Sequence, residues 1–206
     1  MSKTESFASG IILGILCPLC TFILCWWAPA TLNFYRAVPE SWIAASALAG
    51  LAVGIGLDVL YLKSWIPQFY KVDMKLLGLI YLFCSTMAAA FFMGLPLGNL
   101  VLGILAGAYM GRRAYHIGQT RISFPKTTNR FILFTTLVTG AWALWIGLLA
   151  LNDESIIQLL QAVPGLAWVS LTGLAGIGLV ILLTIALMAV QYMCARAAAW
   201  FMFSLE

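Results

Sequence analysis

Long runs of uncharged, apolar residues recur along this chain of 206 residues. Charged residues make up only 9% of the sequence, against about 25% in an ordinary soluble domain, and they are too few to form a water-facing shell. An apolar run of about 20 residues forms a helix long enough to cross the ~30 Å hydrocarbon layer of a bilayer. The sequence therefore predicts an all-α integral membrane protein. It excludes a soluble enzyme and a nucleic-acid-binding protein with a dense basic face.

Six runs have this length and predict a bundle of six transmembrane helices, with residues 1–206 forming a single transmembrane domain. The third and fourth runs are divided by a proline flanked by glycines, Gly94-Leu95-Pro96-Leu97-Gly98, which favours a tight turn. The predicted spans are approximately 7–29, 41–62, 75–95, 96–115, 131–151 and 165–192.

Basic residues indicate the orientation of these spans. If the chain crosses the bilayer six times, every Lys and Arg except Arg36 falls on the same side. Because basic loops stay in the cytoplasm, both termini are predicted to be cytoplasmic. We expect a multi-pass protein of a cell membrane, of the prokaryotic plasma-membrane type, with the lipid bilayer as its main partner.

Two segments allow a second interpretation. The first span, with Lys3 before it and Ala28-Pro29-Ala30 after it, imitates a cleaved signal peptide, but its removal would destroy the charge alternation. Residues 153–163 predict an amphipathic helix at the outer interface. A re-entrant lid is the alternative, although Gln158 and Gln161 would then need polar partners at depth.

Small residues recur at every fourth position in two predicted spans. In lipid, helices associate by close packing of small residues, so such stripes mark buried faces. They predict helix packing, and they can also line a path through the bundle. The stripes are Gly50 and Gly54 in the second span, and Gly103, Gly107 and Gly111 in the fourth.

Asp58 is the only acid within a predicted span, one turn after Gly54. An intramembrane carboxylate is costly unless it is paired, which makes it a candidate proton or cation site. The alternative is an ion pair with a basic residue of a cytoplasmic loop, since Lys63 marks the end of this span five residues later. We expect a polar lining formed by Asp58, Asn99, Thr184 and Gln191.

Cys17 and Cys20 form a CxxC pair, the spacing of dithiol redox centres. Their position near the middle of the first span favours structural thiols instead, because an apolar setting suppresses the reactive thiolate.

The loop between the fourth and fifth spans is basic and is flanked by aromatic residues. Such a loop attracts anionic lipid headgroups or a soluble partner, or it only sets the topology. Its basic residues are Arg112, Arg113, Arg121, Lys126 and Arg130.

Catalytic and cofactor signatures are absent from the sequence. One His cannot form a metal site alone, and no nucleophile lies beside a base within a span. We therefore predict no cofactor, no metal and no nucleic-acid partner, and an enzyme is disfavoured. The leading hypothesis is transport or binding of a small neutral or amphipathic molecule. The alternatives are a non-catalytic subunit or scaffold of a larger membrane complex or homo-oligomer, and a thiol-redox membrane protein.

Overall fold

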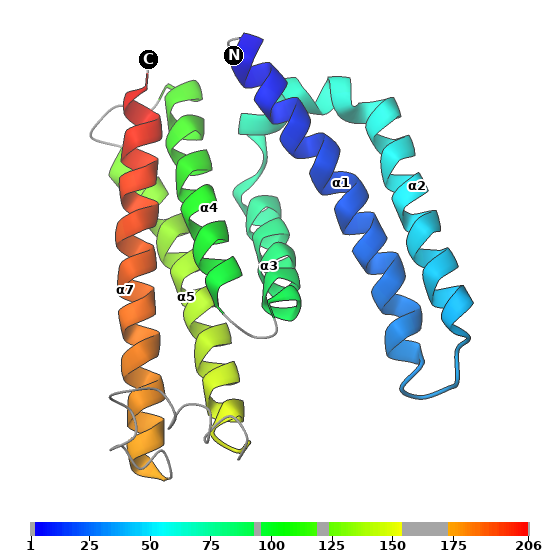
Figure 1. The fold of residues 1–206 in the computed structure, drawn as a ribbon. Helices are drawn as coiled ribbons and strands as arrows, with labels where there is room; N and C mark the ends of the chain where they lie inside the picture. Colours follow the sequence, from blue (N-terminus) through cyan, green and yellow to red (C-terminus); the bar gives the residue numbers. More distant parts are fainter. Residues whose placement is uncertain (1–2, 93–95, 119–123, 154–172, 206) are drawn as a thin grey trace. The chain divides into compact units, whose positions relative to one another are not determined.

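The computed structural model describes residues 3–92, 96–118, 124–153 and 173–205. Every element within these ranges is helical, and five of the helices are long and apolar enough to cross a membrane. This agrees with the prediction of a helical, multi-pass membrane protein. The chain divides into two compact units, unit 1 (Met1–Val72) and unit 2 (Asp73–Glu206), which are described separately (Figure 1).

Unit 1 is a helical hairpin. Helix α1 (Lys3–Leu32) and helix α2 (Glu40–Trp65) pack side by side, and α2 continues into the short 3₁₀ helix η1 (Ile66–Lys71) (Figure 1). The connection between α1 and α2 is held by the Asn33 side chain, whose Oδ1 accepts a hydrogen bond from the Val38 backbone N–H at 2.8 Å.

The two helices of unit 1 approach most closely at the glycines of α2. A Cβ atom at Gly50 would lie 2.6 Å from Cβ of Cys25, and one at Gly54 would collide with Pro18 and Thr21. Ser46 strengthens this interface, because its Oγ donates to the Cys25 carbonyl at 2.8 Å.

Unit 2 contains four described helices: α3 (Met74–Phe91), α4 (Leu97–His116), α5 (Phe124–Ala150) and α7 (Leu174–Ser204). Helices α4 and α7 lie side by side and run parallel to each other (Figure 1). At Gly107 and Gly111 a Cβ atom would collide with main-chain atoms of α7, so the two backbones are in direct contact. The contacting pairs are Gly103 with Gln191, Gly107 with Ala195 and Gly111 with Ala199.

Helix α4 is not among the five apolar candidates for a span. Its 20 residues include Asn99, Arg112 and Arg113, and its glycines contribute little hydropathy. The face that carries those glycines lies against α7, so this face does not need to be apolar.

Several helix boundaries differ from the approximate spans expected, most clearly the end of α7 and the start of α5. Helix α7 begins at Leu174 and continues to Ser204, past the predicted end at residue 192, because Ala195 and Ala199 extend its packing against α4. Helix α5 begins at Phe124, earlier than the predicted start at residue 131, with Pro125 in its first turn, where proline is tolerated. Except for Asp153, the predicted interfacial helix at 153–163 lies outside the described residues.

Candidate functional site

The interior of unit 2 holds polar side chains from all four of its described helices. Tyr81 is 5% exposed, and the other members of the group are completely buried. Each member is an amide, a hydroxyl or a phenol, so the group carries no charged side chain. We call the following set the interior polar cluster: Tyr81 and Ser85 on α3, Asn99 on α4, Thr135 and Thr139 on α5, and Gln191 on α7.

Tyr81 connects the helices of this cluster. Its hydroxyl donates to the Thr135 carbonyl at 3.4 Å and also interacts with the side chains of Thr139 and Gln191. Its ring packs edge-on against Phe131 at a centroid distance of 6.3 Å. This contact orients the phenol toward α5 and α7.

Gln191 occupies a recess that Gly103 provides. A Cβ atom at position 103 would overlap the Gln191 amide, so only glycine leaves room for that side chain against α4. Asn99 lies one turn before Gly103 on the same face of α4 and is also fully buried. Both amides therefore belong to the interface between α4 and α7.

Most polar atoms of the cluster form no hydrogen bond of ordinary geometry. These atoms are Ser85 Oγ, Thr139 Oγ1, and the side-chain nitrogen and oxygen of both Asn99 and Gln191. By contrast, the Thr135 and Thr136 hydroxyls each donate to the Ile132 carbonyl at 2.8 Å. A buried polar atom without a partner costs about 1–3 kcal/mol, and lipid offers no water to replace the partner. The cluster therefore has donors and acceptors that could still form hydrogen bonds with another neutral polar group.

Asp58 belongs to unit 1, where it is 8% exposed. Its carboxylate interacts with the Cys17 thiol, which also donates to the Gly54 carbonyl at 3.8 Å. Asp58 Oδ1 has no hydrogen-bond partner, and no basic side chain in the described part of the chain pairs with this carboxylate. The expected lining residues are thus divided between units, with Asp58 in one and Asn99, Thr184 and Gln191 in the other.

The remaining predicted site residues lie apart from the interior polar cluster or at its edge. Thr184 is 8% exposed and lies two turns before Gln191 on α7. Cys17 and Cys20 are thiols and not a disulfide. Arg112 stacks over the Tyr115 ring, 4.6 Å from its centroid, and donates to the Leu205 carbonyl. Lys126 and Arg130 are exposed, and Arg121 lies outside the described ranges.

Sequence analysis missed Tyr81, Ser85, Thr135 and Thr139. A signal was present, because Tyr81 and Ser85 are one turn apart, and Thr128, Thr135 and Thr139 have the spacing of one helix face. A hydroxyl can bond to its own helix, so this spacing alone does not distinguish a polar interior from ordinary helical threonines.

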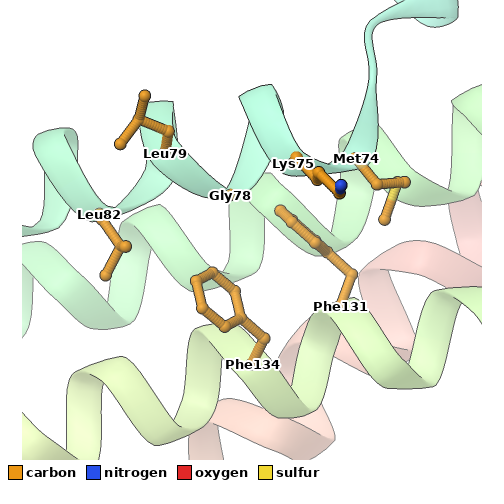
Figure 2. Close-up of a pocket in the computed structure, with 7 residues that line it drawn as sticks. All are labelled: Met74, Lys75, Gly78, Leu79, Leu82, Phe131 and Phe134. Atoms are coloured by element: carbon orange, nitrogen blue, oxygen red, sulfur yellow. The ribbon is translucent and has the colours of Figure 1, made fainter.

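A groove of about 390 Å³ runs between α3 and α5 on unit 2 (Figure 2). Its walls are apolar except for one lysine, and they include no member of the interior polar cluster. The lining residues are Met74, Lys75, Gly78, Leu79, Leu82, Phe131 and Phe134.

Among the described residues, no group of three or more His, Cys, Asp and Glu side chains could hold a metal ion. Comparisons with protein-family models, curated proteins and solved structures find no match to this chain. Functional inference therefore depends on the interior polar cluster, the buried carboxylate and the groove.

Proposed function

We propose that this chain is a multi-pass protein of a cell membrane that binds a small neutral, hydrogen-bonding solute inside unit 2 and moves it across the bilayer. The observation that carries this proposal is the pair of fully buried amides, Asn99 and Gln191, whose side-chain nitrogen and oxygen atoms form no hydrogen bond of ordinary geometry. An interior with these groups is costly in lipid, and a bound polar solute would offset that cost.

The proposed topology has six crossings, with α4 as the least apolar, and both termini in the cytoplasm. Support comes from the ends of the helices in unit 2. Arg113 near the end of α4 contacts Met74 at the start of α3, and Arg112 reaches Leu205 just after α7. These basic residues thus gather at one end of the unit, as the positive-inside rule requires of a cytoplasmic end.

A neutral solute fits the cluster better than an ion. The buried polar side chains described in unit 2 are hydroxyls and amides, which provide donors and acceptors but no counter-charge. A bare ion would lose several kcal/mol of hydration without compensation in such a place. A site built to hydrogen-bond a solute also rejects an apolar analogue, which would leave the amides unpaired.

Solute flux into vesicles tests this proposal. The full chain is reconstituted in proteoliposomes, and swelling in glycerol or urea is followed by stopped-flow light scattering. We expect faster swelling than in protein-free vesicles, and a loss of about tenfold in Asn99→Leu and Gln191→Leu, since one hydrogen bond to the solute is worth about 1–1.5 kcal/mol.

Thr136→Val is the matched control, because the Thr136 hydroxyl donates to the carbonyl of its own helix and is not in the cluster. Two outcomes would contradict the proposal. One is a swelling rate equal to that of protein-free vesicles for every neutral solute tried. The other is unchanged flux in folded Asn99→Leu and Gln191→Leu proteins.

A role as a membrane subunit or scaffold has less support. The glycine stripe of α4, which could otherwise pack against a helix of another protein, is covered by α7 of the same chain, so a partner would need another surface. For thiol-redox chemistry, Cys17 lies in the hairpin interface against Gly54, a position that suits packing.

A further inference from the structure

The groove between α3 and α5 is apolar with a basic residue at one end, and it is not part of the proposed solute site. We propose that it holds one acyl chain of an anionic phospholipid, with the lipid phosphate against Lys75 and Arg113. None of the groove residues belongs to the interior polar cluster, so this inference stands independently of solute transport.

The groove has the length and surface of an acyl-chain site within one leaflet. It extends along α3 from Met74 to Leu82, which is about 12 Å of helix. Figure 2 shows Met74 and Lys75 at one end, Leu82 toward the other, and the rings of Phe131 and Phe134 projecting from α5. Every wall along this path is apolar beyond Lys75.

Gly78 leaves the space at the middle of the groove. A Cβ atom there would lie 3.7 and 3.8 Å from two atoms of the Phe134 ring, which is ordinary van der Waals contact. A larger side chain at this position would extend into the groove and occupy the volume that we assign to the lipid.

The charge at the Lys75 end is positive. Lys75 lines the groove, and Arg113 Nη1 donates to the sulfur of Met74, which is another lining residue at this end. Thioether sulfur is a weak acceptor, so phosphate oxygens would be better partners for this guanidinium. Asp73 is the nearby acid, and its Oδ1 accepts from the Lys75 backbone N–H at 3.1 Å as the cap of α3.

The headgroup, and not the chain, gives this site its selectivity. Bilayer tails are as apolar as the groove, so the acyl chain gains little by entering it. Each basic residue near the membrane surface favours an anionic lipid about fivefold, which predicts about 25-fold for Lys75 and Arg113 together. A second copy of the chain fits less well, because close helix packing needs repeated small residues and the groove offers only Gly78.

Native mass spectrometry of the full chain in detergent tests the proposal. Phosphatidylglycerol and phosphatidylcholine with identical acyl chains are added in equal amounts, and the bound fractions are compared. We expect phosphatidylglycerol to be retained about 25-fold over phosphatidylcholine, and Lys75→Gln to reduce this preference about fivefold. Lys126→Gln is the matched control, since Lys126 is exposed on α5 and does not line the groove.

A second pair of variants tests the groove itself. Gly78→Leu fills the groove and should lower the amount of bound phosphatidylglycerol, whereas Gly178→Leu on α7, where nothing lies within 4 Å of an added Cβ, should not. If Gly78→Leu does not fold, the comparison of Lys75→Gln with Lys126→Gln still decides the test.

Four results would overturn the proposal. Equal retention of the two phospholipids would remove the headgroup selectivity. If Lys75→Gln and Lys126→Gln reduce the preference for phosphatidylglycerol equally, the lipid is attracted by the basic surface in general and not by the groove. Preferential retention of free oleate would assign the groove to a fatty acid, and a dimer lost in Gly78→Leu would assign it to a second copy of the chain.

Discussion

Unit 1 and unit 2 bury different kinds of polar group. The two-helix hairpin of unit 1 covers one carboxylate, Asp58, which keeps 8% of its surface exposed beside the Cys17 thiol. The four described helices of unit 2 enclose Asn99 and Gln191 completely. Full enclosure of an ionised group costs several kcal/mol more than that of an amide. Unit 2 thus buries amides and hydroxyls, whereas the buried polar group of unit 1 that can carry a charge is the incompletely buried Asp58 carboxyl.

The largest expected effect concerns the packing that encloses the cluster of unit 2. Gly107→Leu places a side chain against the main chain of Ala195, which cannot move aside without separating α4 from α7. We expect a loss of about 3 kcal/mol or more, measured as the stability of the purified protein in detergent. Gly178→Leu should differ from the wild type by less than about 0.5 kcal/mol. A Gly107→Leu protein with wild-type stability would show that the backbone contact is dispensable.

Neutralising Asp58 tests whether unit 1 carries a costly charge. Asp58→Asn should stabilise the hairpin by about 1–2 kcal/mol, which is less than the cost of a charge at a helix centre because Asp58 lies nearer the end of α2. The stability of unit 1 is read from the denaturant dependence of maleimide labelling at Cys17. Asp73→Asn, at an exposed helix cap, is the control and should not stabilise. Destabilisation by Asp58→Asn would show that the carboxylate is well paired. The difference drawn above between the buried polar groups of the two units would then not hold.

A smaller effect is expected from the Thr139 hydroxyl, which forms no hydrogen bond of ordinary geometry. Thr139→Val removes an oxygen that lies near the Tyr81 hydroxyl but forms no hydrogen bond of ordinary geometry, and it should stabilise solute-free protein by about 1 kcal/mol while slowing solute flux. Thr136→Val removes a hydroxyl bonded to the Ile132 carbonyl and should change neither property appreciably. Lower stability in Thr139→Val would mean that this hydroxyl already has a partner in the resting protein.

The smallest effect concerns the cysteines of unit 1. Alkylation of Cys17 and Cys20 should be the same with and without reductant, because both are thiols that pack within the hairpin. Exposed Cys194 provides the reference for rapid labelling. Labelling of the pair that appears only after reduction would instead support the redox hypothesis.

Sequence patterns were sufficient to predict the features of the fold that depend on composition and on the length of apolar runs. The length of each apolar run located most of the helices, and in the structure Gly103, Gly107 and Gly111 of α4 lie against α7. The extension of α7 was missed because Arg196 resembles the end of a span, whereas the packing of Ala195 and Ala199 continues the helix.

Contacts between distant helices could not be predicted in the same way. The neighbours Tyr81 and Thr139, or Cys17 and Asp58, come from different helices, and the rotation of each helix about its axis decides whether they meet. Hydropathy contains almost no information about that rotation when lipid and protein interior are both apolar. Asn99 and Gln191 were found only because amides are rare in such segments.

The parallel contact between α4 and α7 also limits how unit 2 can move. Three successive turns of α4 each fit one turn of α7 through a glycine, so sliding by one residue would drive larger side chains into the opposite backbone. The two helices are therefore locked in register and translate together as a rigid body. If the proposed solute enters between this pair and α3, Tyr81 on α3 must separate from Gln191 on α7.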